Sequence, residues 1–224
     1  MDLLLKLALW APPLLFAVII HEYAHGRAAE RLGDPTARLM GRLTFNPLPH
    51  IDIVGSIIFP GLLFLASGGN MLFGWAKPVP VNPYNLRNAQ KDMVWISLAG
   101  PGANLAGALA CGLLIRLMGL SGLEPQGIWF PVHALLLFGL MINVVLAVFN
   151  LIPIPPLDGS KVLAGFLPYR LYVGYMKLER FGMFIIIGLL IAGQVLGIHI
   201  LGTIIMPALN LFVRLFAGIE LGRF

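Results

Sequence analysis

Long apolar runs, separated by short polar stretches, set the hydrophobic pattern of this chain. A helix that crosses a bilayer needs about 20 predominantly apolar residues. Four runs reach this length, and one further run is doubtful because Pro60-Gly61 interrupts it. The pattern therefore predicts an all-α polytopic membrane protein. The runs lie at residues 3–25, 53–74, 93–118, 131–152 and 181–206, and the interrupted run is 53–74.

The interrupted run at 53–74 has two interpretations, and the basic residues help to choose between them. Lys and Arg follow the first run and the interrupted run, and they recur at 153–180, whereas the loop at 119–130 has none. Basic loops favour the cytoplasmic side of a membrane. If 53–74 returns to the side it left, all basic stretches share one face; if it crosses, basic loops lie on both sides. We favour the re-entrant arrangement, in the cell membrane and with the basic face cytoplasmic.

Two short stretches between the apolar runs suggest extended chain. Residues 36–45 alternate loosely between polar and apolar positions, which is typical of short strands. Residues 75–81 are a second candidate, in which Pro78 and Pro80 permit only an edge strand. Together these features predict about four to six transmembrane helices, with short membrane-associated β-strands and a re-entrant segment. We expect them to form one integral membrane domain over residues 1–224.

Composition agrees with a chain that lies in lipid. Of the 224 residues, 58% are hydrophobic and only 11% are charged, whereas soluble domains carry about 25% charged residues. The net charge of +5 is modest, and no basic patch with interleaved aromatic residues points to nucleic acid. The single cysteine, Cys111, excludes an intramolecular disulfide and is interpreted as a packing residue in a helix.

A cluster of ionisable residues ends the first apolar run. Residues 21–25 read His-Glu-Tyr-Ala-His, the HExxH pattern. Residues four apart share one face of a helix, so His21 and His25 can reach the same metal ion. Glu22 lies one step round the helix, near enough to take a proton from water. The alternative is that these are ordinary polar residues facing the cytoplasm, but ionisable groups in a membrane helix are costly and by default functional.

Two histidines leave a catalytic zinc site one protein ligand short, because such sites usually have three and keep one position open. Asp158 is the strongest candidate for the third ligand, since it follows a spanning run and a proline-rich turn. Gly159 then permits a sharp turn into a new helix. An aspartate before Gly-Ser-Lys is also a good helix N-cap, which is the alternative for this residue. The need for a third ligand favours Asp158 as part of a site for one Zn²⁺ per chain.

Three motifs, in this order on separate apolar runs, resemble those of the site-2 protease family. They are HEYAHG at 21–26, AGPGAN at 99–104 and NLIPIPPLDG at 150–159. Residues 41–52 and 74–82 are also similar to the compact prokaryotic branch of that family, which lacks PDZ and CBS domains. Ile53 departs from the pattern of this branch, where proline is expected, but the departure concerns a loop.

The resemblance implies a zinc metalloendopeptidase in which His21, His25 and Asp158 hold the metal and Glu22 activates water. It also implies that a membrane-spanning protein is cleaved near the cytoplasmic side, to release a regulatory protein or to clear a signal-peptide remnant. Without a PDZ- or CBS-like extension, gating is expected to come from the membrane core or from a separate regulatory membrane protein.

Two amides are candidates for contact with the substrate backbone or the oxyanion. Asn150 precedes the proline run in the family motif, and Asn104 ends AGPGAN. Preorganised donors of this kind stabilise developing charge. A helical substrate must also be unwound before attack, and an exposed strand edge at 36–45 or 75–81 could hold it extended. The alternative for both amides is hydrogen bonding between helices, and it is the better interpretation for Asn104.

Two other functions compete with that of a protease. A transporter or channel could use an intramembrane His/Asp cluster as an ion site, but a metal route commonly needs ionisable sites through the membrane, and these lie at one depth. A proteolytically inactive relative that binds membrane proteins would usually lack a ligand or the base, and neither is missing here. The residues therefore favour a protease and leave the substrate and its cleavage position open.

Overall fold

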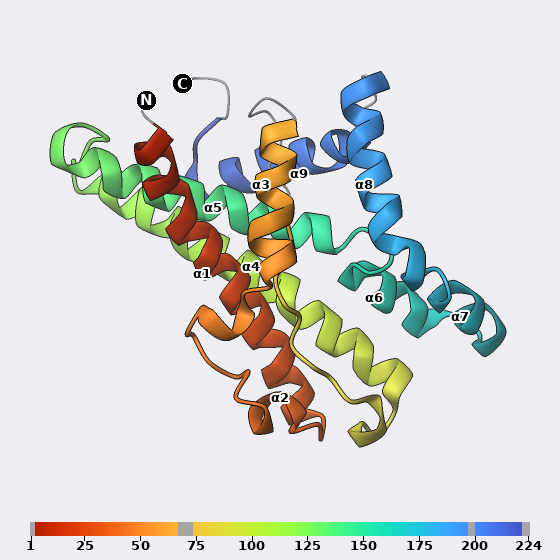
Figure 1. Ribbon diagram of the computed structural model, residues 1–224. Helices are drawn as coiled ribbons and strands as arrows, with labels where there is room; N and C mark the ends of the chain where they lie inside the picture. Colours follow the sequence, from red (N-terminus) through yellow and green to blue (C-terminus); the bar gives the residue numbers. More distant parts are fainter. Residues whose placement is uncertain (1–2, 67–73, 197–199, 221–224) are drawn as a thin grey trace.

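The computed structural model describes residues 3–66, 74–196 and 200–220, and every regular element in these ranges is a helix (Figure 1). The long helices are α1 (Leu3–Arg31), α4 (Ala89–Leu120), α5 (Phe130–Asn150), α8 (Glu179–Leu196) and α9 (Ile200–Ala217). The shorter ones are α2 (Thr36–Leu39), α3 (Phe59–Ala66), α6 (Asp158–Phe166) and α7 (Tyr169–Met176). Single turns are η1 (Leu48–His50), η2 (Ile53–Ile58), η3 (Pro83–Asn85) and η4 (Gly127–Trp129). The predicted all-helical class is confirmed.

Helices α1, α4 and α5 pack against one another, and α9 packs across α4 and α5 (Figure 1). The largest apolar core lies between α4, α5 and α9, where Ala108, Leu140, Val144 and Val213 are completely buried. Small residues let these helices approach closely, as is usual in membrane bundles. A Cβ at Gly112 of α4, for example, would lie 2.6 Å from the Cβ of a phenylalanine on α9.

Three helices in the described ranges are long and apolar enough to cross a membrane, namely α4, α5 with the preceding turn η4, and α9. Helix α1 has 29 residues and is therefore about 44 Å long. Large apolar side chains on these helices are exposed, among them Phe16, Leu117 and Leu211. The predicted total of about four to six spans is not confirmed, since length and composition identify only three in this part of the chain.

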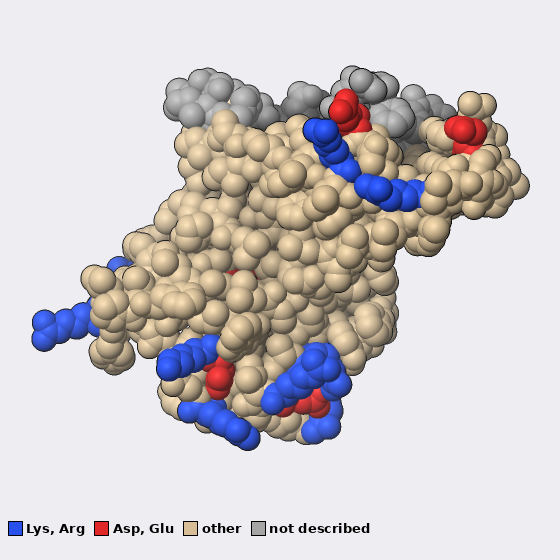
Figure 2. Space-filling view, turned by 180° about the vertical axis from the view of Figure 1, so that it is seen from behind, with Lys and Arg blue, Asp and Glu red and all other residues tan. Residues whose placement is uncertain are grey.

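Charged side chains gather at the bottom, at the upper right and at the left edge of the face shown in Figure 2. The broad central area consists of other residues, and only a small acidic area is visible in it. Lipid-facing surfaces are expected to have this distribution, because a charge is costly inside the hydrocarbon layer. The fold thus agrees with the membrane class that the composition predicts.

The run predicted at 181–206 is two helices, α8 and α9, and the prediction of one element there is wrong. Residues 197–199 between them lie outside the described ranges. Helix α9 continues past residue 206, where the predicted run ended, to Ala217, and Leu209, Val213 and Ala217 share one face of it and are buried. One-sided burial therefore extends α9 through a stretch that is only partly apolar.

The two ends of the interrupted run, 53–74, lie next to each other in the structure. Residues 53–66 form η2 and α3, and 67–73 lie outside the described ranges. Trp75 N–H donates to Gly55 O at 3.0 Å, and Ser56 Oγ–H donates to Trp75 O at 2.9 Å. Glycine at position 55 permits this contact, because a Cβ there would overlap the indole of Trp75. The two ends of the segment lie side by side, as a re-entrant element requires.

The predicted strands are not found in the described residues. Thr36–Leu39 is the short helix α2, because the buried carboxylate of Asp34 accepts hydrogen bonds from the backbone N–H and hydroxyl of Thr36 and turns the chain. Residues 75–81 have no regular structure. Pro78 and Pro80 have no N–H to give to a ladder, and the remaining groups bond to loops and side chains.

Asp34 also joins the end of α1 to η3. Its Oδ2 accepts from the Asn82 N–H at 2.7 Å and its Oδ1 accepts from the Asn85 amide at 2.8 Å. Burial by itself raises the pKa of this carboxyl, but the hydrogen bonds from Thr36, Asn85 and Asn82 outweigh it and hold the pKa below its ordinary value. This junction connects the helix that carries HExxH to the extended segment that follows α3.

Candidate metal centre

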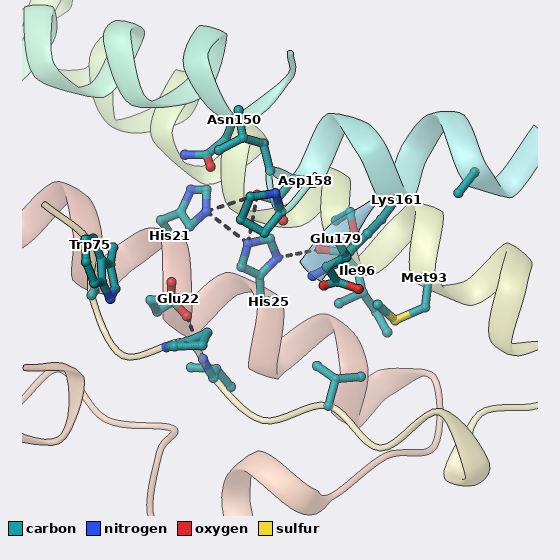
Figure 3. A pocket seen from close by; sticks show the side chains of 18 of the residues that line it. His21, Glu22, His25, Trp75, Met93, Ile96, Asn150, Asp158, Lys161 and Glu179 are labelled. Atoms are coloured by element: carbon teal, nitrogen blue, oxygen red, sulfur yellow. Dashed lines mark hydrogen bonds and ion pairs between the residues drawn. The ribbon is translucent and has the colours of Figure 1, made fainter. Parts of the chain in front are cut away.

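A pocket of about 650 Å³ opens between α1, α4, α6, α8 and the segment after α3 (Figure 3). His21, Glu22, His25 and Asp158 all line it, in an otherwise largely apolar wall. A concave apolar site with a few converging polar groups is the usual form of a ligand or active site. The pocket therefore brings together the residues that the HExxH pattern and the proline-rich turn predict.

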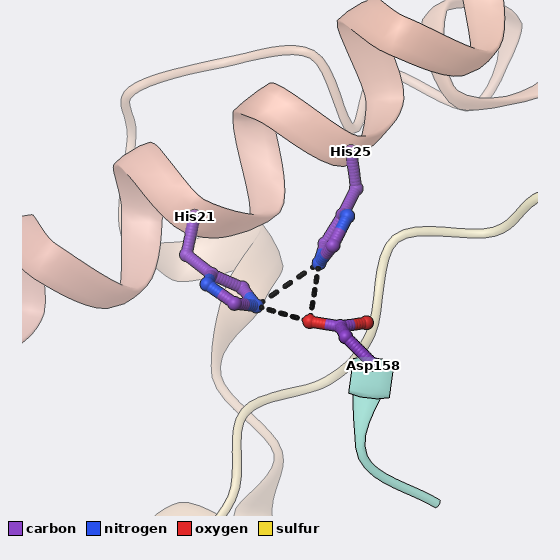
Figure 4. Close-up of side chains that lie close together, drawn as sticks. All are labelled: His21, His25 and Asp158. Atoms are coloured by element: carbon purple, nitrogen blue, oxygen red, sulfur yellow. Dashed lines mark hydrogen bonds and ion pairs between the residues drawn. The ribbon is translucent and has the colours of Figure 1, made fainter. Parts of the chain in front are cut away.

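The three predicted metal ligands lie against one another (Figure 4). His21 and His25 are one turn apart on α1, and Asp158 is the first residue of α6. Each histidine Nε2 lies 3.1 Å from Asp158 Oδ2, and the two Nε2 atoms are 3.0 Å apart. Ligand atoms placed tetrahedrally around zinc are separated by about 3.3 Å. Two imidazole nitrogens and one carboxylate oxygen at this spacing therefore fit Zn²⁺, both in chemistry and in geometry.

The other nitrogen of each imidazole is held by α4. His21 Nδ1 lies 2.6 Å from Asn104 Oδ1, and His25 Nδ1 lies 2.6 Å from Ile96 O. Because each of these partners is an acceptor, the proton belongs on Nδ1, and the Nε2 lone pair is left for a metal. Helix α4 therefore sets both the tautomer and the direction of the two histidines.

Asn104 lies behind His21 and is completely buried. Its amide nitrogen donates to Ala17 O and to Asn143 Oδ1, each at 2.9 Å, and Asn143 in turn donates to Gly139 O. It is not among the pocket-lining residues. The structure therefore gives Asn104 the interhelical bonding that was its alternative interpretation, together with a bond to a metal-ligand candidate.

Asn150 and Asp158 stand at the two ends of the proline-rich turn, and both line the pocket. Asn150 lines the pocket near His21 in Figure 3, and its amide nitrogen donates to Leu146 O of the same helix at 3.0 Å. Gly159 allows α6 to begin against the end of α5, because a Cβ at this position would overlap the carbonyl of Leu151. The turn places Asp158 deep enough to meet α1, which a simple surface cap would not do.

Glu22 points from α1 toward the segment after α3 (Figure 3). Its Oε2 accepts a hydrogen bond from Val79 N–H at 2.8 Å. Neither this bond nor the carbonyl of Ile96 was foreseen, because both are backbone groups that every residue of their kind carries. Pro-Val-Pro at 78–80 was the available signal for the first, since Val79 alone in this run has an N–H.

Comparison with known proteins gives consistent matches. Residues 127–193, which include Asn150 and Asp158, match the sequence profile of Peptidase family M50. A Bacillus subtilis protein with the provisional name zinc metalloprotease YwhC is 32% identical over 207 residues, which is 92% of this chain and 90% of that protein.

Two proteins provisionally named zinc metalloprotease Rip2 are also similar. The one from Mycolicibacterium smegmatis is 33% identical over 79% of this chain and 64% of its own length. The one from Mycobacterium tuberculosis H37Rv is 34% identical over 66% and 53%, respectively. No solved structure shows a significant match.

Proposed function

Because the chain belongs to peptidase family M50, the site-2 proteases, and is a zinc metalloprotease, we propose that it hydrolyses membrane-spanning proteins at the centre formed by His21, His25 and Asp158. The observation that carries this proposal is the meeting of two imidazole Nε2 atoms and one carboxylate oxygen, all within 4.8 Å. In the described residues no other group of His, Cys, Asp and Glu is arranged to hold a metal. A metal-transport route, which needs successive sites, has no such support.

Glu22 is the general base and acid of the proposed reaction. Bound at this centre, Zn²⁺ supplies the Lewis acidity that hydrolysis of an amide requires. The Glu22 carboxylate lines the same pocket as the ligand candidates. It takes a proton from the attacking water and returns it to the leaving amine. Asn150, which also lines the pocket, is the proposed donor to the substrate backbone.

The proposed substrate is a transmembrane protein, which must enter the pocket extended. Ala76, Pro78, Val79 and Val81 line the pocket as a non-helical segment. Backbone groups on a segment of this kind can pair with an unwound substrate even where no strand ladder exists beforehand. Release of a regulatory protein and clearance of a signal-peptide remnant both require such a cut, and a separate regulatory membrane protein would supply the gating.

The proposed location is the cell membrane, with the pocket toward the cytoplasm and the chain forming one membrane domain over 1–224. His21 is six positions before Arg27, or about 9 Å along the helix axis. Arg27 and Arg31 end α1, and α2 follows at the same end of the bundle in Figure 1. The loop after α4, which lacks Lys and Arg, lies at the opposite end. The positive-inside tendency supports this orientation.

Replacing Glu22 with glutamine tests the proposed chemistry. The amide cannot accept the proton of the attacking water, whereas all three metal-ligand candidates remain. We expect cleavage of a labelled transmembrane peptide in proteoliposomes to be abolished, with zinc content unchanged. Asp158→Asn is the matched variant and should lower zinc content as well. Cleavage that persists in zinc-loaded Glu22→Gln protein would refute the assigned base, and membrane proteomics on the same variant would reveal the substrates that accumulate.

A further inference from the structure

The Pro78-Val79-Pro80 run has a single backbone N–H, and that N–H binds Glu22. Prolines have no N–H group, so Val79 carries the only donor of the run. Val79 is 8% exposed, and its N–H donates to Glu22 Oε2 at 2.8 Å. Among the described residues the other carboxylate oxygen, Oε1, has no hydrogen bond. One oxygen of the carboxylate is therefore held and the other is left for chemistry.

Arg42 holds the same peptide group from the opposite side. Its guanidinium Nη2 donates to Lys77 O at 2.7 Å and to Pro78 O at 3.2 Å. The Pro78 carbonyl belongs to the peptide whose N–H is that of Val79. In a trans peptide these two groups point in opposite directions. Arg42 and Glu22 are thus connected through one peptide unit, with the cation at its carbonyl and the carboxylate at its N–H.

Arg42 is buried although it has no acidic partner among the described residues. The side chain is 7% exposed, and in the described residues no acidic group lies within ion-pair distance of it. A buried cation without a counter-charge is costly, and breaking the contacts that compensate it costs more. Here backbone carbonyls of the 77–79 segment supply the compensation. The position of Arg42 is therefore determined by this segment and not by a salt bridge.

A third contact limits the freedom of the segment. Lys77 N–H donates to the carbonyl oxygen of His50 at 2.9 Å, and His50 itself is 3% exposed. The segment is consequently held by η1 on one flank, by Arg42 at its carbonyls and by Glu22 at the Val79 N–H. These contacts join residues far apart in sequence, so the arrangement does not arise from local chain geometry.

We propose that Arg42 is a positioning residue for Glu22 and acts through the Pro78–Val79 peptide group. The guanidinium fixes the orientation of this peptide, and the N–H of Val79 then fixes the rotamer of Glu22. Oε1 is thereby directed at the reacting water while Oε2 stays bound. The inference rests on the proposed role of Glu22 as general base. It predicts a loss of kcat that exceeds any change in KM, with no loss of zinc.

Arg42→Met is the first test, because methionine fills the same space without donors. We expect kcat for the labelled transmembrane peptide to fall by about 10- to 100-fold, the usual cost of a misplaced catalytic group, with a smaller change in KM and with zinc content unchanged. Arg42→Lys keeps a cation that can reach the carbonyls and should recover part of kcat. Arg38→Met is the matched control, since Arg38 is an exposed arginine of α2 whose ion pair, among the described residues, is with Glu30. It should behave as wild type.

Val79→Pro tests the route through the peptide. This variant lacks the N–H but retains the extended backbone that Pro80 already imposes, and it should lose kcat to the same extent as Arg42→Met. Val79→Thr keeps the N–H and should lose much less. In the Val79→Pro background, Arg42→Met should have no further effect, because the group through which it acts is gone. If Arg42→Met fails to fold, Arg42→Lys in both backgrounds replaces it.

Three results would overturn the inference: an unchanged kcat in Arg42→Met, equal kcat losses in Val79→Thr and Val79→Pro, or an Arg42 effect that multiplies fully with that of Val79→Pro. The last would indicate a purely structural role. Glu22→Gln, measured in parallel, separates this inference from the proposed function. Active Glu22→Gln protein refutes the base itself, whereas inactive Glu22→Gln beside fully active Arg42→Met refutes only the positioning.

Discussion

His21 and His25 face α4 at the point where Gly100 stands. A Cβ at Gly100 would lie 2.7 Å from His21 Cε1 and 2.6 Å from His25 Cε1, too close for either ring to stay in place. In an isolated helix alanine is favoured over glycine by about 1 kcal/mol. Gly100 therefore lowers the intrinsic stability of α4, and the imidazole rings of His21 and His25 fill the space that a side chain would occupy.

Gly100→Ala should accordingly displace both imidazoles without unfolding α4. We expect the variant to retain helicity but to bind zinc about 10- to 100-fold more weakly, as when contacts around a metal ligand are lost. Zinc titration followed by a competing chelator would measure this. Gly102→Ala is the control on the same helix, because no atom lies within 4 Å of its added Cβ. Equal zinc affinity in the two variants would contradict the assigned role of Gly100.

At the residue scale, the sequence predicts the candidate ligand side chains, but it does not predict the backbone groups that hold the site residues in position. HExxH spacing puts two histidines on one face of a helix, and the need for a third ligand points to Asp158. Their metal-binding roles stay predictions, although the structure brings the three side chains together. The carbonyl of Ile96 and the N–H of Val79 could not be foreseen, since backbone groups leave no mark in the sequence and their use depends on tertiary packing.

At the scale of elements, hydrophobic runs located the long helices, and local polar chemistry decided the exceptions. The alternation over 36–45 favoured a strand, but a single carboxylate, that of Asp34, turns the chain into α2. Burial of one face accompanies the extension of α9 beyond residue 206, where the predicted run ended. Both the short helix α2 and the length of α9 depend on contacts between residues that are close in space. The hydrophobic periodicity of a single segment carries no information about these contacts.

Asp34→Asn should weaken the junction between α1 and η3 in a pH-dependent way. Hydrogen bonds to a charged group are worth about 2 kcal/mol, so zinc-free protein should melt at lower temperature at pH 7. Because the folded-state pKa is lowered, this contribution is present above the unfolded pKa of about 3.9. It is lost as the pH falls through the folded-state pKa. The difference in melting temperature between wild type and variant should therefore shrink on acidification, and a constant or growing difference would contradict this account.

At the scale of the whole molecule, the distribution of basic residues predicts which end of the bundle faces the cytoplasm. Tyr84 is 97% exposed near the end of α1, and Gln126 is exposed in the loop after α4, at the opposite end. In a Cys111→Ser background, an impermeant thiol reagent should label Gln126→Cys in intact cells. It should label Tyr84→Cys only after the membrane is opened. Labelling of Tyr84→Cys in intact cells would reverse the orientation and with it the cytoplasmic position of the pocket.

The re-entrant arrangement of 53–74 stays a prediction from charge, since it alone puts every basic stretch on one face. The contact between Trp75 and Gly55 supports it, because it shows that the two ends of the segment lie side by side. The number of spans is harder to predict from the sequence. An apolar helix buried inside a bundle has a composition similar to that of a helix that faces lipid. Only three described helices meet the criterion for a span without ambiguity.

The ligand candidates enter the chain in a fixed order. His25 and Asp158 are separated by 133 positions, so during synthesis the histidines are inserted long before the aspartate that completes their set. Until α5 and the following turn have entered the membrane, the nascent chain carries a base and two imidazoles but not the full set that zinc requires. The candidate set is therefore complete only once α6 begins, while α7, α8 and α9 still have to follow, and we expect chains that end before this point to be unable to hold zinc with three protein ligands.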